Sequence, residues 1–144
     1  MIENIAQTLS DTARLLGSRA AVTEAGSGRT CSFSELDLYA DRYGAYLKAE
    51  GVKSGDRVIL MVRPSIDFIA LAFSLFRIGA PVILIDPGMG YKNLLKCIEN
   101  VKPDFLVGIP AGVGVSRIYS AKFRSVRIRL WGGSFLGIKK CDIR

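Results

Sequence analysis

The segment from residue 51 to residue 109, GVKSGDRVILMVRPSIDFIALAFSLFRIGAPVILIDPGMGYKNLLKCIENVKPDFLVGI, decides the fold class. It contains β-rich runs at residues 58–62, 82–85 and 105–109, and between them two stretches of helical character at residues 65–78 and 91–101. Strands alternating with helices are typical of a parallel sheet with helices packed against it. The sequence therefore predicts an α/β fold with a parallel sheet and flanking helices.

The ends and composition of these elements support the prediction. Short apolar runs closed by Gly, Pro or Asp are typical of strands buried on both faces. Pro64 and Ser65 stand where the first helix would begin, since Pro is tolerated in a first turn, and Gly79 stands where it would end. That helix is apolar nearly all round, so we expect it to be covered on most sides. Its polar residues fall on one narrow stripe: Asp67, Ser74 and Arg77.

The first fifty residues have a different pattern. Residues 2–16 follow the spacing of an amphipathic helix that stops at Gly17, and residues 20–24 and 30–33 are strand candidates. The turn between them, AGSG at residues 25–28, predicts a short β-hairpin that precedes the sheet. A phosphate loop at residues 26–28 is the alternative, although no helix begins directly after it.

A further helix is predicted over about residues 34–50. Ser32 and Glu35 fit a capping box, with Ser34 and Asp37 as an alternative cap. Its apolar stripe has helical spacing: Leu36, Ala40, Tyr43 and Leu47.

Composition places the chain among globular proteins of one modest domain, with 144 residues, 49% hydrophobic and 23% charged. The net charge of +7 lies wholly in residues 115–144, which carry eight basic residues and one acidic residue. One interpretation is a surface for nucleic acid or for an acidic membrane. The other, which we favour because no nucleic-acid module accompanies the charge, is a solvated segment or one that meets a partner segment.

Histidine is absent, and this excludes Ser-His-Asp and Cys-His nucleophiles and any His-ligated metal. Cys31, Cys97 and Cys141 are odd in number and form no CxxC pair, which argues against a disulfide framework or a zinc site. Cys97 falls beside the apolar face of its helix, so we expect it to be a small buried residue.

Membrane segments and leaders are not expected. Asp67, Arg77 and Pro81 interrupt the long apolar stretch at residues 66–85. The first 20 residues are amphipathic and charged and contain no apolar signal core. We therefore expect a cytoplasmic protein.

Few residues suggest a ligand site. Asp86 follows a strand at the carboxyl end of the predicted sheet, where ligands of open α/β sheets bind, but residues 86–90 (DPGMG) are first of all a turn. Gly112 and Gly114 would begin a dinucleotide fingerprint, but Arg117 stands where its third small residue is needed. Beyond them we expect a short basic helix at residues 115–124, a strand from residue 126 to residue 131, and no interpretable pattern in the last eleven residues.

Five short stretches form a recognisable set of motifs: residues 30–36 (TCSFSEL), 55–58 (GDRV), 77–80 (RIGA), the strand that runs into Asp86 and Pro87, and 102–107 (KPDFLV). They resemble the N-terminal part of the adenylate-forming (AMP-dependent) acyl-CoA synthetase and ligase superfamily. Residues 86–90, followed by 92–97 (KNLLKC), resemble the fatty-acid–CoA ligase-like branch that includes the olefin β-lactone synthetases. The resemblance covers residues 10–110 well and 111–133 loosely. It implies a partial N-terminal AMP-binding-enzyme domain at residues 1–133 and an unassigned tail at 134–144.

The resemblance implies a chemistry for the whole family member. ATP and Mg²⁺ convert a fatty or β-hydroxy acid into an acyl-adenylate, which passes its acyl group to coenzyme A or closes to a β-lactone. The family's phosphate loop, adenylate motifs and lid lysine are not found here. Gly132, Gly133 and Ser134 are too short a stretch to replace the loop, and Lys139 and Lys140 follow none.

We therefore predict no catalytic, cofactor-binding or metal-binding residues in this chain, and none of the family's activity for it alone. We expect a fragment of a ligase or, alternatively, an interaction module or half of a split enzyme that needs a complementing chain. A third reading, nucleic-acid binding through residues 117–129, is the least expected.

Overall fold

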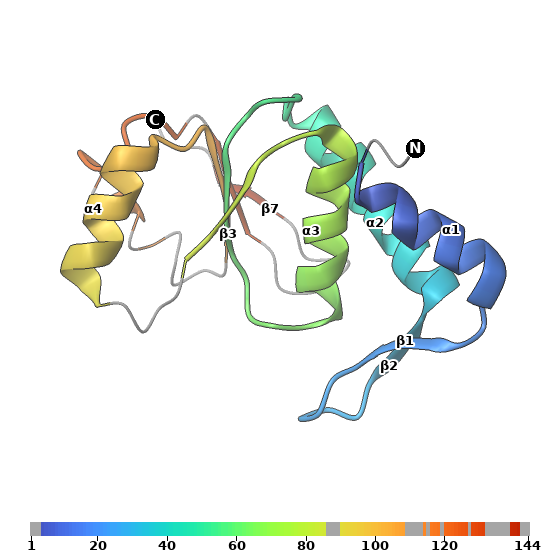
Figure 1. Ribbon diagram of the computed structural model, residues 1–144. Helices are drawn as coiled ribbons and strands as arrows, with labels where there is room; N and C mark the ends of the chain where they lie inside the picture. Colours follow the sequence, from blue (N-terminus) through green and yellow to red (C-terminus); the bar gives the residue numbers. More distant parts are fainter. Residues whose placement is uncertain are drawn as a thin grey trace. The chain divides into compact units, whose positions relative to one another are not determined.

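The computed structural model describes residues 4–85, 90–108, 114, 116–118, 120–126, 128–131 and 139–141 (Figure 1). Along the chain the elements are α1 (Ala6–Leu16), β1 (Ala20–Thr23), β2 (Thr30–Ser32), α2 (Phe33–Ala49), β3 (Val58–Met61), α3 (Ile66–Ile78), β4 (Val82–Leu84), α4 (Tyr91–Val101), β5 (Phe105–Gly108), β6 (Ile128–Trp131) and β7 (Lys139–Cys141). They belong to two compact units, the first made of residues 1–54 and 64–80 and the second of residues 55–63 and 81–144.

The first unit contains the hairpin and three helices, α1, α2 and α3, which lie side by side (Figure 1). The apolar stripe predicted for α2 is buried, with Leu36, Ala40, Tyr43 and Leu47 each at most 3% exposed. Strands β1 and β2 pair antiparallel, which confirms the predicted hairpin. Gly28 in the turn has φ +69°, a conformation that glycine adopts without strain, and its amide donates to the Glu24 carbonyl.

Local capping fixes where the helices begin and end. The capping box at α2 is present: Ser32 Oγ accepts from the Glu35 amide, and the Glu35 carboxylate accepts from the Ser32 amide at 2.8 Å. Ser65 caps α3, and Gly79 ends it with φ +78°. Pro64 therefore precedes the cap and lies two positions before Ile66, the first residue of the helix, instead of in the first turn as the sequence suggested.

The second unit is built on a five-stranded sheet with the order β4-β3-β5-β6-β7. The pairs β3–β4, β3–β5 and β5–β6 are parallel, which confirms the predicted parallel sheet. The final pair, β6–β7, is antiparallel. Strand β7 falls in the last eleven residues, for which no interpretable pattern was expected.

One face of this sheet is covered by α4 and by residues 123–126. Ile59 of β3 and Leu106 of β5 form a buried cluster with side chains of those segments: Leu94, Ile98, Phe123 and Val126. The apolar face predicted for α4 is thus confirmed. The prediction for Cys97 was wrong, because its side chain is exposed, one position before the buried Ile98.

The strands differ in how deeply they are buried. All four residues of β5 are buried, as are the first three of β3, as expected for strands buried on both faces. Strand β4 departs from this expectation, because it lies at the edge of the described sheet and Leu84 is 61% exposed. The apolar run at residues 82–85 indicated a strand correctly but not its place in the sheet.

Two further expectations have simple outcomes. Of the basic helix predicted at residues 115–124, residues 116–118 are helical, while residues 120–125 form turns. No helix in the described parts of the chain is long and apolar enough to cross a membrane.

Candidate functional site

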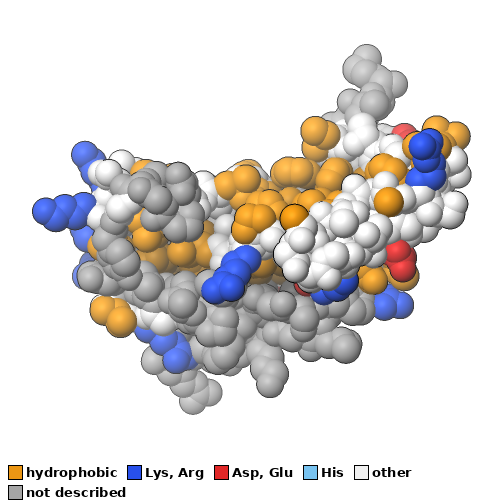
Figure 2. Space-filling model, turned by 90° about the horizontal axis from the view of Figure 1, so that it is seen from below, with side chains coloured by type: hydrophobic (Ala, Val, Ile, Leu, Met, Phe, Trp, Pro, Cys, Tyr) orange, Lys and Arg blue, Asp and Glu red, His pale blue; other side chains and the backbone are white. Residues whose placement is uncertain are grey.

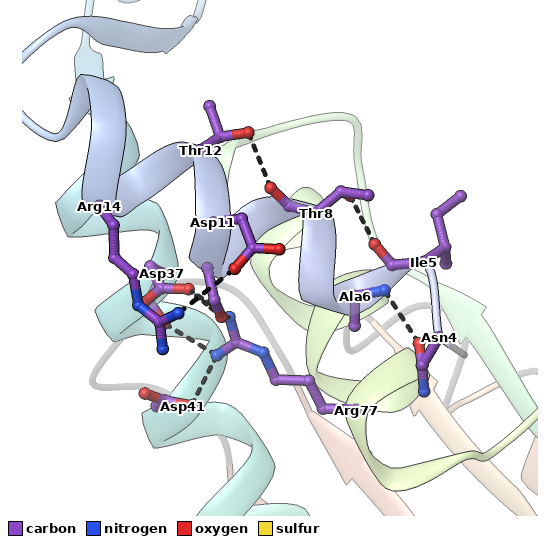
Figure 3. Close-up of polar contacts among 11 residues, drawn as sticks. Asn4, Ile5, Ala6, Thr8, Asp11, Thr12, Arg14, Asp37, Asp41 and Arg77 are labelled. Atoms are coloured by element: carbon purple, nitrogen blue, oxygen red, sulfur yellow. Dashed lines mark hydrogen bonds and ion pairs between the residues drawn. The ribbon is translucent and has the colours of Figure 1, made fainter. Parts of the chain in front are cut away.

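A group of polar side chains in the first unit surrounds Arg77, on the last turn of α3 (Figure 3). Its guanidinium forms ion pairs with Asp37 and with Asp41 of α2, the latter at 2.5 Å. It also donates to Ser10 Oγ of α1 at 2.9 Å. Arg77 thus joins all three helices, and we call these four residues the arginine clamp.

Helical spacing explains the clamp. Asp37 and Asp41 are four residues apart on α2, so both carboxylates face the same direction. The Arg77 side chain is only 18% exposed, and the Asp37 side chain is 26% exposed, so water screens this pair less than a surface pair. A shallow pocket of about 410 Å³ lies beside it, lined by both carboxylates and by residues of α1 such as Ala13 and Arg14.

The clamp is suited to holding helices together and not to binding a cation. A metal ion at Asp37 and Asp41 would lie next to the Arg77 guanidinium, which is paired with both carboxylates and would repel a second cation. Arg14, on the rim of the pocket, is paired with Asp11 at 3.3 Å. Within the described ranges there is no group of three or more Cys, Asp or Glu side chains that could hold a metal.

A second polar pair is buried between α2 and α3. Tyr43 Oη donates to Asp67 Oδ1 at 2.7 Å, and the two residues are 3% and 5% exposed. Burial, followed by the hydrogen bond to Asp67, raises the pKa of the Tyr43 phenol well above its usual value. The phenol therefore keeps its proton at neutral pH, and the pair serves as a fixed hydrogen bond and not as a base.

Cys31 is the buried thiol of the first unit, at 2% exposed. Burial, together with the nearby Glu35 carboxylate, raises the pKa of Cys31 to about 11. A thiol with so high a pKa is protonated at neutral pH, and the thiolate is the reactive form. Cys31 is therefore a packing residue and not a nucleophile.

The glycine turn at residues 26–28 lies beside a carboxylate. Glu24 accepts from the Ile66 amide at the start of α3 and from Ser27 Oγ within the turn, at 3.0 and 2.7 Å. These two hydrogen bonds, the first being the larger cause, lower the pKa of Glu24, which is therefore ionised at neutral pH. A fixed negative charge next to the turn opposes phosphate binding, so the geometry favours the hairpin turn over the phosphate loop.

The other residues singled out in the sequence are scattered or undescribed. Asp86, Gly112 and residues 132–134 lie outside the described residues. Lys139 and Lys140 belong to β7, and Arg117 is exposed in the second unit. The sequence located the polar stripe of α3 but not its partners on α1 and α2.

The match to a family model covers most of the chain. Residues 9–129 match the model of the AMP-binding enzymes.

The chain belongs to the AMP-binding enzyme family. This confirms the resemblance that the sequence motifs indicated, and it accounts for the described fold.

Two curated relatives place the chain within the family more closely. An olefin β-lactone synthetase from Xanthomonas campestris pv. campestris is 34% identical over 122 residues, which are 85% of this chain and 22% of the relative. Another, from Stenotrophomonas maltophilia, is 36% identical over 114 residues, 74% of this chain and 20% of the relative. The predicted similarity to this branch is confirmed, and the chain spans about a fifth of the length of these relatives.

Two solved structures share the fold described above. The inhibitor-bound N-terminal domain of FACL13 from Mycobacterium tuberculosis aligns with a TM-score of 0.83 at 19% identity, over 93% of this chain and 34% of that domain. A long-chain-fatty-acid–CoA ligase from Archaeoglobus fulgidus aligns with a TM-score of 0.81 at 18% identity, over 91% of this chain and 27% of that one. These alignments confirm the α/β fold of the N-terminal domain of adenylate-forming enzymes.

Proposed function

We propose that this chain is the N-terminal portion of an ATP-dependent ligase that activates a fatty acid or a β-hydroxy acid. The observation that carries the proposal is the 34% identity to an olefin β-lactone synthetase over 122 residues. In the reaction, a carboxylate oxygen of the acid attacks the α-phosphorus of ATP, pyrophosphate leaves, and an acyl-adenylate forms. Mg²⁺, held by groups outside this chain, would offset the phosphate charge, and coenzyme A is the acceptor where a thioester is made.

The described residues of this chain contribute a scaffold to that reaction. The arginine clamp and the Tyr43–Asp67 hydrogen bond fix three helices, and the parallel sheet supplies a rigid layer. Catalysis of phosphoryl chemistry rests on positioned cations and amides around the phosphates. We propose that those groups come from outside this chain, that residues 1–133 form the partial domain and 134–144 a tail, and that the protein is cytoplasmic.

A chimera tests the assignment. The matching residues of the Xanthomonas campestris synthetase are replaced by residues of this chain, and acid-dependent exchange of pyrophosphate into ATP is measured with fatty and β-hydroxy acids. We expect exchange with one of these acid classes. A folded chimera that exchanges with neither class, while the parent synthetase does, would overturn the proposal.

The isolated chain gives the complementary result. Residues 1–144 alone are expected to catalyse no pyrophosphate exchange with either class of acid. Acid-dependent exchange by the purified chain would show that its own residues bind ATP and would refute the proposed scaffold role.

Strand β4 supports a second candidate function, half of a split enzyme or a non-catalytic interaction module. It lies at the edge of the described sheet with Leu84 exposed, and such edges pair readily with strands of other chains. The native mass, detected with an antibody to residues 1–50, separates the possibilities. A band far above 15.7 kDa indicates one long ligase, whereas a band at 15.7 kDa that copurifies with a second chain indicates a split enzyme.

A further inference from the structure

A segment of the second unit has one buried side and one basic, exposed side. The buried side of residues 116–126 consists of Ser116, Phe123 and Val126, each at most 7% exposed. Phe123 and Val126 pack into the apolar cluster beneath α4. The side chains on the other side are exposed: Arg117, Ile118, Lys122 and Arg124. Ile118 is 77% exposed and directly follows the exposed Arg117.

Helix α4 extends this basic surface. Lys92 and Lys96 are exposed and lie four residues apart, on one side of the helix. Lys122 reaches the same helix, with its Nζ 2.7 Å from Glu99 Oε2, so the segment and the helix form one surface. We call Lys92, Lys96, Arg117, Ile118, Lys122 and Arg124 the basic face. Figure 2 shows Lys and Arg side chains on the left, the side on which Figure 1 places α4.

Positive charge exceeds negative charge on this part of the chain. Residues 90–126 contain six Lys and Arg and two carboxylates, all of them described. The carboxylates are already engaged, Glu99 with Lys122 and Asp104 with Arg57. Residues 90–126 therefore carry a net charge of +4, which attracts an anionic partner.

We propose that the basic face docks on the surface of an anionic lipid bilayer, with Ile118 at the boundary between headgroups and acyl chains. An apolar side chain among cations is the pattern of proteins that lie on membranes, because burial of apolar area adds to the attraction of anionic lipids. A nucleic-acid backbone would use the cations but gives an exposed isoleucine no apolar environment. The inference does not depend on the acid or on the reaction proposed above.

The test measures binding of the whole 144-residue chain to sedimented phosphatidylcholine vesicles, with and without phosphatidylserine. Each cation near an anionic surface strengthens binding about fivefold. Replacement of both Lys92 and Lys96 by Ala is therefore expected to weaken binding to phosphatidylserine vesicles about thirtyfold. The matched control replaces Arg19 and Lys48, two exposed cations of the first unit, by Ala and is expected to leave binding unchanged.

The isoleucine has its own test. Ile118→Ser is expected to weaken vesicle binding up to about tenfold, since one aliphatic side chain leaves the apolar phase. Leu15→Ser, at an 82% exposed position of α1, is the control and should have no effect. Variants are compared with the parent chain only where their circular dichroism spectra match. The preference of the parent chain for vesicles with phosphatidylserine is a test that does not depend on any variant.

Four outcomes would overturn the proposal. They are equal binding to both kinds of vesicle, no binding at low salt, equal losses in the basic-face and control variants, and binding to RNA without binding to vesicles. The last would assign the surface to nucleic acid.

Discussion

The two compact units of this chain are stabilised by different kinds of long-range contact. In the first unit, polar side chains join elements distant in sequence, as in the arginine clamp, the Tyr43–Asp67 pair and the hydrogen bond from the Ile66 amide to Glu24. In the second unit, backbone pairing and an apolar cluster around Ile59 and Leu106 do most of this. Its two ion pairs, Arg57–Asp104 and Lys122–Glu99, are more exposed to water than the pair of Arg77 with Asp37. In both units the burial of apolar side chains supplies most of the free energy of folding. The polar pairs of the first unit also determine which faces of its helices pack together.

The largest expected effect falls on the apolar cluster of the second unit. Phe123→Ala should lower the free energy of unfolding by about 3–5 kcal/mol, because it leaves a cavity beneath α4. Urea denaturation measures the loss, and hydrogen exchange should locate it in β5 and α4. Ile118→Ala, in the same segment but exposed, should change stability by less than about 0.5 kcal/mol. Similar effects for the two variants would show that the cluster does not stabilise this unit.

A smaller effect is expected for the buried polar pair of the first unit. Tyr43→Phe removes the hydroxyl that donates to Asp67 and should cost about 1.5–3 kcal/mol, since the carboxylate stays buried without that donor. Chemical denaturation is again the measurement. Tyr46→Phe, on the same helix and half-buried, is the control and should be nearly neutral. An equally small effect at Tyr43 would mean that the pair adds little stability to the first unit.

The buried thiol makes the stability of the first unit fall at alkaline pH. The pKa of Cys31 is raised from 9.0 to about 11 in the folded state, so the folded chain holds this proton more tightly than the unfolded chain. The contribution of the protonated thiol to the free energy of unfolding is complete below about pH 9. It is lost as the pH rises toward about pH 11, by at most about 1.4 kcal/mol per pH unit.

Denaturation midpoints measured between about pH 8 and about pH 10 test this dependence. Cys31→Ala should flatten the decline, and Cys97→Ala, at an exposed thiol, should leave it as it is. A decline that is unchanged in Cys31→Ala would assign it to other groups.

The smallest expected effect concerns the capping box of α2. Ser32→Ala removes the acceptor of the Glu35 amide and should lower the free energy of unfolding by about 1 kcal/mol. Ser34→Ala, at the alternative cap that the sequence allowed, should have little effect. A larger loss for Ser34→Ala would place the start of the helix later than Phe33.

The two units also differ in how far sequence reasoning reached. In the second unit, the parallel strands and the apolar face of α4 followed from local apolar patterns. The exposed position of β4 and the existence of β7 did not, because strand order and strand pairing depend on segments distant along the chain. In the first unit the capping box and the hairpin were predictable, since their residues are neighbours in sequence.

The residues that pair with Asp67 and Arg77 could not be predicted from the sequence, for a physical reason. Asp67 and Arg77 stood out as polar residues in an apolar helix, but an ion pair leaves no periodic signal in the partner element. Asp37 is an example, because the sequence suggested it as an alternative cap and the structure pairs it with Arg77. The similarity to ligases rested on short motifs, most of which lie at turns and at the ends of elements.

The order of strands in the sheet bears on how the chain would fold as it leaves the ribosome. Of the strands in the five-stranded sheet, β3 is synthesised first, but it lies between β4 and β5. Its second neighbour, β5, therefore emerges only with residues 105–108. The first unit, by contrast, needs nothing beyond residue 80. During translation the helical unit can therefore close early, while β3 waits with an open edge for nearly 50 further residues and is the part of the nascent chain that a chaperone would protect.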